Sequence, residues 1–125
     1  MRRPWLALVL CTFIGAASAL DRSALLGTWH LEQKDPDMGL LVTDMTFEEN
    51  GTFHGFVDVN GKRQWNFGGK WVLSGDWLHY HYTKSDMPQL GPGTKDRDRV
   101  LEISEKKLRL VAGSGEEIYV RKGKP

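Results

Sequence analysis

The sequence predicts an all-β fold, an eight-stranded antiparallel up-and-down barrel that follows a cleaved signal peptide. Apolar and polar residues alternate in one run after another, which is typical of strands with two different faces. Short, glycine-containing stretches separate most of these runs, and short connections make neighbouring strands antiparallel. No long helix is expected. Eight strands in this order are enough to close a barrel with room for a small ligand.

The first 19 residues have the pattern of a signal peptide. Arg2 and Arg3 make a basic start, residues 5–14 are almost all apolar, and Ala17-Ser18-Ala19 has the small-x-small form of a cleavage site. The apolar run is too short to be a stable membrane anchor. We therefore expect a periplasmic or secreted protein whose single domain spans residues 20–125.

Composition narrows the classes of partner. Cleavage would leave 106 residues with 15 basic and 16 acidic side chains, a balance that argues against nucleic acid or an anionic membrane as partner. The one cysteine, Cys11, lies in the expected signal peptide, so no disulfide is predicted. A closed sheet suits such a domain, because no strand edge is left unpaired.

A helical turn is expected over residues 21–26, with Asp21 or Ser23 as its cap. Asn50-Gly51 and Asn60-Gly61 are strong hairpin turns, because both residue types tolerate a positive φ. Gly68-Gly69 within a strand predicts a bulge. The eight strands are expected over 26–32, 40–48, 52–59, 63–73, 77–83, 99–103, 107–111 and 117–121. An immunoglobulin-type sandwich is the competing fold, but it would need longer crossovers.

Several of these segments resemble the calycins, and in particular the small bacterial lipocalin-like domains. Gly27-Thr28-Trp29 looks like the calycin Gly-x-Trp signature, and residues 47–53, 69–71 and 75–78 are similar to the bacterial domains. In calycins a basic residue near the end of the last strand lies across the signature tryptophan, and Arg121 occupies that place here. The resemblance therefore implies a barrel closed at one end by Trp29 and Arg121, and it suggests ligand binding without naming a ligand.

The alternating pattern turns a set of large side chains toward the barrel interior. Two interpretations stay open: these side chains line a pocket for a small apolar or amphipathic molecule, or they simply fill a narrow barrel. The long irregular stretch 84–97 is expected to gate the mouth of such a pocket. The candidate ligand-binding residues are Met45, Phe53, Trp65, Phe67, Trp71, Tyr80 and Tyr82.

His79 and His81 are two residues apart on one strand, so they share a face. With His54 or a carboxylate they would make a metal site. Leu78, Tyr80 and Tyr82 are the more apolar alternate set, which predicts that both histidines face solvent, where they would make a pH-sensitive surface instead. A shift of one residue in register would reverse this placement. No cofactor is predicted.

No catalytic residue is predicted. Gly113-Ser114-Gly115 is expected as a turn, because it lacks the frame of a nucleophile elbow. The alternating charges of residues 96–99 are expected at the solvated end of a loop. An enzyme would need two or more of a scattered set of side chains to converge in a cleft. That set is His54, His79, His81, Asp44 and Asp58.

The favoured function is thus an exported, non-catalytic barrel that binds a small apolar or amphipathic ligand. The alternative is a protein-interaction module, an inhibitor or immunity-type partner of an exported enzyme, that acts through loops and outer surface. Its support in the sequence is the long loop with Met87-Pro88 and the outward aromatic Phe56.

Overall fold

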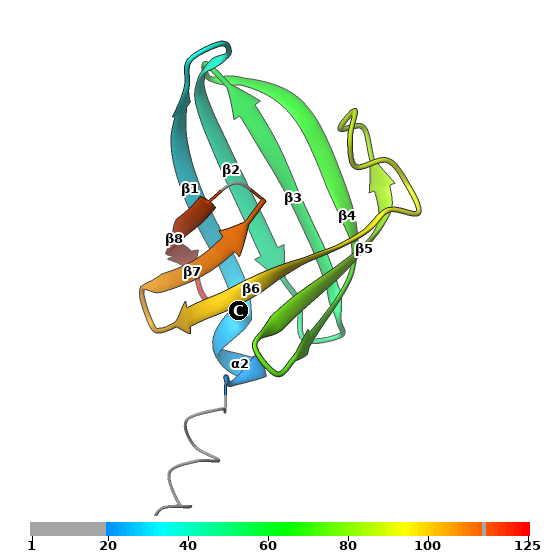
Figure 1. The fold of residues 1–125 in the computed structure, drawn as a ribbon, viewed down its shortest axis with the longest axis vertical. Helices are drawn as coiled ribbons and strands as arrows, with labels where there is room; N and C mark the ends of the chain where they lie inside the picture. The colour runs from blue at the N-terminus through cyan, green and yellow to red at the C-terminus, as the bar shows by residue number, and fades with distance from the viewer. Residues whose placement is uncertain (1–19, 114) are drawn as a thin grey trace, which may run out of the picture.

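The computed structural model describes residues 20–113 and 115–125, and the predicted signal peptide lies outside these residues. Eight antiparallel strands close into a barrel in which each strand pairs with its neighbours in sequence and the last pairs with the first (Figure 1). The fold class predicted from the sequence is confirmed. The strands are β1 (Gly27–Asp35), β2 (Gly39–Phe47), β3 (Thr52–Val59), β4 (Lys62–Ser74), β5 (Trp77–Ser85), β6 (Lys95–Ile103), β7 (Lys107–Ala112) and β8 (Gly115–Gly123).

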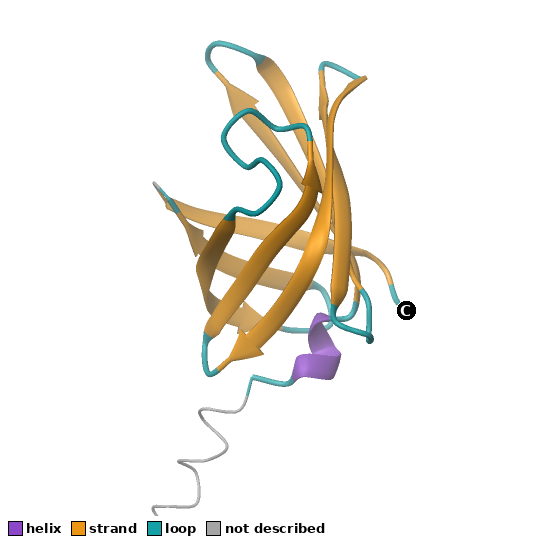
Figure 2. Ribbon diagram, turned by 90° about the vertical axis from the view of Figure 1, so that its right-hand side faces the viewer, coloured by secondary structure: helices purple, strands orange, loops and turns teal. Residues whose placement is uncertain are grey.

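The helical turn α2 (Arg22–Leu25) lies at one end of the barrel, which we call the α2 end (Figure 2). Asp21 is its cap, because the carboxylate accepts hydrogen bonds from the Ser23 amide at 3.0 Å and from the Ser23 hydroxyl at 2.8 Å. Leu25 is fully buried. Within the described residues, no helix is long and apolar enough to cross a membrane.

The connections alternate between the two ends of the barrel. The turns β2–β3, β4–β5 and β6–β7 lie at the α2 end, and the other four connections lie at the opposite end, which we call the loop end (Figure 1). The Arg22 guanidinium donates to the Glu49 carbonyl at 2.8 Å and so fixes α2 to the β2–β3 turn. The α2 end is therefore covered by the chain itself.

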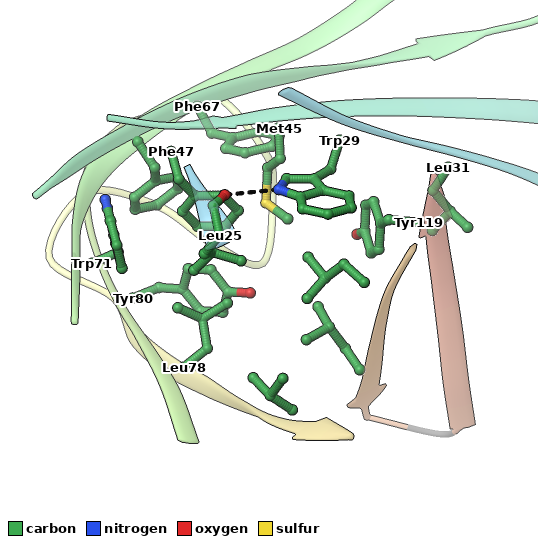
Figure 3. Packing of buried hydrophobic residues seen from close by; sticks show 14 of the residues in the cluster. Leu25, Trp29, Leu31, Met45, Phe47, Phe67, Trp71, Leu78, Tyr80 and Tyr119 are labelled. Atoms are coloured by element: carbon green, nitrogen blue, oxygen red, sulfur yellow. Dashed lines mark hydrogen bonds between the residues drawn. The ribbon is translucent and has the colours of Figure 1, made fainter. Parts of the chain in front are cut away.

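Large apolar side chains fill the barrel toward the α2 end (Figure 3). The rings of Phe47 and Trp71 meet edge to face at 5.4 Å between centroids, and Phe53 meets Tyr82 in the same way at 5.3 Å. Each such side chain contributes about 2 to 3 kcal/mol when it is buried. The predicted facing of the fifth strand is also confirmed: Leu78, Tyr80 and Tyr82 are buried.

The bulge predicted at Gly68-Gly69 is present. The register between β4 and β5 shifts between these two residues. A Cβ on Gly69 would lie 2.0 Å from the backbone oxygen of His81, so the close approach of the two strands requires glycine there. The bulge bends the sheet where the barrel turns its corner.

The predicted sixth strand and the long loop before it need correction. β6 begins at Lys95 rather than at Arg99, and β5 continues to Ser85, so that the loop shortens to residues 86–94. The alternating charges of residues 96–99 belong to a paired strand and not to a solvated loop end. The sequence pattern misled because the inward positions of this strand carry carboxylates instead of apolar side chains.

Candidate functional site

A cavity of about 360 Å³ lies inside the barrel on the side of the loop end. It is bounded by the strand walls and by residues of three connections, among them Met38, Leu90 and Gly113. Five of the seven predicted ligand-binding residues line it, which are Met45 on β2, Trp65 and Phe67 on β4, and Tyr80 and Tyr82 on β5. The barrel wall therefore brings an apolar and aromatic surface around a space of the size that small-molecule sites have.

The other two predicted residues, Phe53 and Trp71, do not reach the cavity. Both are almost fully buried in the packed half of the barrel. The Trp71 indole donates to the Glu48 carbonyl at 3.1 Å, and the Arg22 guanidinium lies 4.5 Å from the ring centroid. The sequence left open whether the interior is hollow or filled. The structure shows a filled half at the α2 end and a hollow half at the loop end.

Trp29 and Arg121 lie opposite each other where β1 meets β8, at the α2 end. The guanidinium carbon is 4.2 Å from the indole centroid. Arg121 also donates to the carbonyls of Leu26 at 2.8 Å, Ala24 at 2.6 Å and Glu105 at 2.7 Å. The Trp29 indole donates to the Leu25 carbonyl at 2.8 Å (Figure 3). This pair thus ties α2, the last strand and the β6–β7 turn together beneath the core.

Three carboxylates on the cavity wall were not predicted: Asp96 and Asp98 on β6, and Glu117 on β8. The Tyr80 hydroxyl donates to Asp98 at 2.9 Å. The Tyr119 hydroxyl donates to Glu117 at 3.3 Å. The alternation of β6 could have revealed the first two, because Asp96 and Asp98 occupy the same face as the buried Val100.

The surroundings of two of these carboxyls, Asp98 and Glu117, disfavour the charged form. Burial raises the pKa of Asp98 to about 6; the hydrogen bond from Tyr80 opposes this rise, and the charges of Asp96 and Glu117 add to it. Burial likewise raises the pKa of Glu117. The cavity therefore combines an apolar wall with two carboxyl groups, Asp98 and Glu117, that ionise less readily than in water.

No basic side chain balances this charge in the described part of the cavity wall. The described residues that line it include no lysine, arginine or histidine. Among the described residues, none of the three carboxylates takes part in an ion pair, although the outer surface carries several, such as Arg63 with Asp58 at 2.6 Å. The interior at the loop end is therefore acidic.

The loop over residues 86–94 borders the cavity, and its role as a gate stays a prediction. Met87 and Leu90 pack against the core and line the cavity. The backbone holds the loop to β5 through Gly93 N–H to the Tyr82 carbonyl at 2.7 Å and Tyr82 N–H to the Thr94 carbonyl at 2.9 Å. The loop thus presents apolar side chains inward from a fixed base.

The histidines lie elsewhere. His79 and His81 are on the outer face of β5, opposite in direction to Tyr80 and Tyr82. His54 is exposed on β3 and lies 3.4 Å from Glu48. In the described part of the chain, no group of three or more His, Cys, Asp or Glu side chains is placed to hold a metal ion.

The five side chains considered for catalysis point outward from β2, β3 and β5, and among the described residues no hydrogen bond joins any two of them.

Asp44 is buried at 4% exposure between two other partners, His30 Nδ1 at 2.6 Å and Lys122 Nζ at 2.6 Å. Burial alone would raise the pKa of Asp44, but Lys122 and His30 outweigh it, so that the pKa is lowered. This cluster fastens β8 to β1 and β2 on the outside of the barrel.

Comparisons with known proteins bear on the fold. No protein-family model matches the sequence, and no curated protein does. Among solved structures, the chain is similar to an uncharacterized protein from Bacteroides eggerthii, at 17% identity and a TM-score of 0.56, over 78% of this chain and 99% of that one. It is also similar to a lipocalin-like protein from Bacteroides uniformis, at 21% identity and a TM-score of 0.54, over 79% of this chain and 98% of that one. The eight-stranded antiparallel barrel of this chain thus has the lipocalin-like fold.

Proposed function

We propose that this protein is an exported, non-catalytic barrel that binds a small apolar or amphipathic molecule in the cavity at the loop end. The observation that carries the proposal is the cavity of about 360 Å³ walled by Met45, Trp65, Phe67 and Tyr82. Burial of a ligand against this wall supplies about 25 cal/mol per Å² of apolar area, less the cost of immobilising the ligand. The tyrosine hydroxyls and the carboxylates of the wall orient the ligand through hydrogen bonds to its polar group.

The interaction-module alternative has less support. Its support was the outward aromatic Phe56, which does face outward, but the Arg63 guanidinium covers that ring at 3.5 Å from its centroid. It also depended on the long loop, whose Met87 packs inward against the core. Both features weigh toward the cavity as the site of function.

Export is part of the proposal and rests on residues 1–19 of the sequence. N-terminal sequencing of the protein recovered from its own host tests it. A mature chain that begins at Leu20 is the expected result, and a chain that retains residues 1–19 would contradict it.

Binding is tested with N-phenyl-1-naphthylamine, an uncharged probe that becomes fluorescent in apolar surroundings. Ala112 lines the cavity, whereas its neighbour Val111 faces outward and is exposed. We expect Ala112→Phe to fill the space and weaken probe binding at least about tenfold, about 1.4 kcal/mol. Val111→Phe adds the same side chain outside the barrel and should leave binding unchanged. Equal binding by both variants, with circular dichroism showing both folded, would place the probe outside the cavity and overturn the proposal.

A further inference from the structure

The cavity wall carries an unbalanced negative charge inside an apolar enclosure. Asp98 and Glu117 line it from β6 and β8, the two strands that flank β7, and the more exposed Asp96 lies nearer the loop end on β6. The hydroxyls of Tyr80 and Tyr119 donate hydrogen bonds to Asp98 and Glu117 but bring no charge. Carboxylates in such surroundings destabilise the fold unless a cation pairs with them. An arrangement that costs stability is typical of a site built for a ligand.

A second observation points into the same space. Tyr82 lines the cavity and is only 6% exposed. Its hydroxyl makes no hydrogen bond to any side chain in the described part of the chain, and burial raises its pKa, so that it stays a neutral donor and acceptor. A buried hydroxyl normally has a hydrogen-bond partner, so the Tyr82 hydroxyl is available to a group that enters the cavity.

The chemistry of the wall defines that group. A metal ion does not fit, because among the described residues no three carboxylate or imidazole groups are close enough to share one. An ammonium group suits the chemistry of these side chains, because its N–H groups donate to carboxylate and phenol oxygens and its charge is attracted to the faces of tyrosine rings. The apolar body of the same molecule would lie against Met45 and Phe67.

We propose that the cavity selects a protonated amine carried on an apolar body, with Asp98 and Glu117 as its counter-charges and the Tyr82 hydroxyl as a further partner. This inference rests on the proposed function, because it names the ligand class of the same cavity. It also explains why an overall nearly neutral chain, with a formal charge of +1, keeps its basic side chains off the described part of this wall.

Three molecules with the same eight-carbon chain separate charge from apolar burial: octylamine, 1-octanol and octanoate. At pH 7.5 they present a cation, a neutral hydroxyl and an anion. Isothermal titration calorimetry on the purified protein should show octylammonium binding at least about tenfold more tightly than 1-octanol, with octanoate weakest. Preference for the alcohol or the anion would overturn the inference while leaving the proposed function intact. Absence of binding by all three would overturn both.

Matched variants test whether Asp98 and Glu117 cause the preference for the amine over the alcohol. Glu117→Gln together with Asp98→Asn removes the two charges and should bring the affinities for octylamine and 1-octanol to within about threefold. Glu116→Gln makes the same chemical change one residue away on the outer face, where Glu116 pairs with Arg109 at 2.7 Å, and it should keep the preference for the amine. An undiminished preference in the double variant would show that these carboxylates do not select the ligand.

Discussion

At the residue scale, Gly27 shows what the first strand requires. It has a φ of +111°, and a Cβ there would lie 2.4 Å from the Gly123 carbonyl and 3.0 Å from the Arg121 guanidinium. Glycine is thus required here for two reasons: the backbone has a positive φ, and β8 lies too close for a side chain. Without this approach Arg121 would not lie over Trp29.

Gly27→Ala is therefore expected to destabilise the protein by about 3 kcal/mol or more, as a shift in the urea midpoint of unfolding. Gly61→Ala is the matched control, because Gly61 also has a positive φ, +85°, but a Cβ added to it would have no neighbour within 4 Å. Strain alone should cost the control about 1 kcal/mol. Equal losses in the two variants would show that the contact with β8 contributes nothing.

Residue-scale prediction from the sequence succeeded where a residue has a local signal. A helix cap at Asp21 or Ser23 was predicted from side-chain chemistry, and Asp21 is the cap; the bulge at Gly68-Gly69 was predicted from the backbone freedom of glycine. The Asp44–His30–Lys122 cluster has no such signal, because Asp44 and Lys122 are 78 residues apart and meet only through the closure of the barrel.

At the element scale, the sequence pattern predicted β6 over residues 99–103 and missed its beginning, residues 95–98. Its inward positions run Asp96, Asp98, Val100, so that polar residues occupy the face that normally identifies a strand by its apolar side chains. The same feature hid two residues of the site, Asp96 and Asp98. Met45, Trp65 and Tyr82 were predicted from apolar alternation. Asp96 and Asp98 could be found only by extending the register of β6 to the residues before Val100, its first apolar residue. Glu117 lay within the predicted eighth strand, but an acidic residue gives no signal of an inward side chain.

The carboxyl of Asp98 has an ordinary pKa of 3.8, raised to about 6 in the folded protein. Below pH 3.8 the carboxyl is protonated in both the folded and the unfolded state. As the pH rises from 3.8 through 6, the unfolded state ionises more readily than the folded state, so the free energy of unfolding falls. Above pH 6 the folded protein holds a buried charge. Asp98→Asn should therefore stabilise the protein by about 1 to 2 kcal/mol at pH 7.5, after allowance for solvent screening, and by nothing near pH 3.5.

The same substitution on the outer face of β2 should have the opposite sign. The pKa of Asp44 is lowered in the folded state, so its contribution is present at neutral pH and is lost as the pH falls below its ordinary value of 3.8. Asp44→Asn should cost about 2 kcal/mol at pH 7.5. Urea unfolding of both variants at the two pH values measures the pair. A loss of stability in Asp98→Asn at pH 7.5 would contradict the burial of an uncompensated charge.

At the scale of the whole molecule, the barrel divides into a packed half and a hollow half. The overall architecture could be predicted because it repeats one local unit, two alternating runs and a turn. The division into two halves could not be predicted, because the alternating pattern places both Phe53 and Phe67 on the inner face. Phe53 fills the core, whereas Phe67 lines the cavity. Only the position of each ring along the barrel axis distinguishes them.

The acidic interior should make ligand capture depend on pH. Asp98 on β6 has titratable neighbours at the cavity. They include Tyr80 and Tyr82 on β5, Asp96 on β6 and Glu117 on β8. Because its pKa is raised to about 6, the charge is largely lost by pH 5. We expect the affinity for octylammonium to fall about tenfold between pH 7.5 and pH 5, measured by calorimetry.

The binding of 1-octanol over the same range serves as the control and should stay constant, since no charge is involved. An affinity for octylammonium that does not change with pH would show that the ionisation of Asp98 plays no part in binding.

The pairing of β1 with β8 has a consequence for assembly. Seven of the eight strand pairings join neighbours along the chain and can form as local hairpins, whereas the eighth must bring the first and last strands of the barrel together. The hydrogen bonds from Arg121 to Leu26 and Ala24 span 95 and 97 residues. Closing the barrel therefore costs the loop-closure entropy of the whole domain at one short pairing of strands. The stacked Arg121 and Trp29 side chains offset this cost, because they hold the first and last strands together once the hairpins have formed.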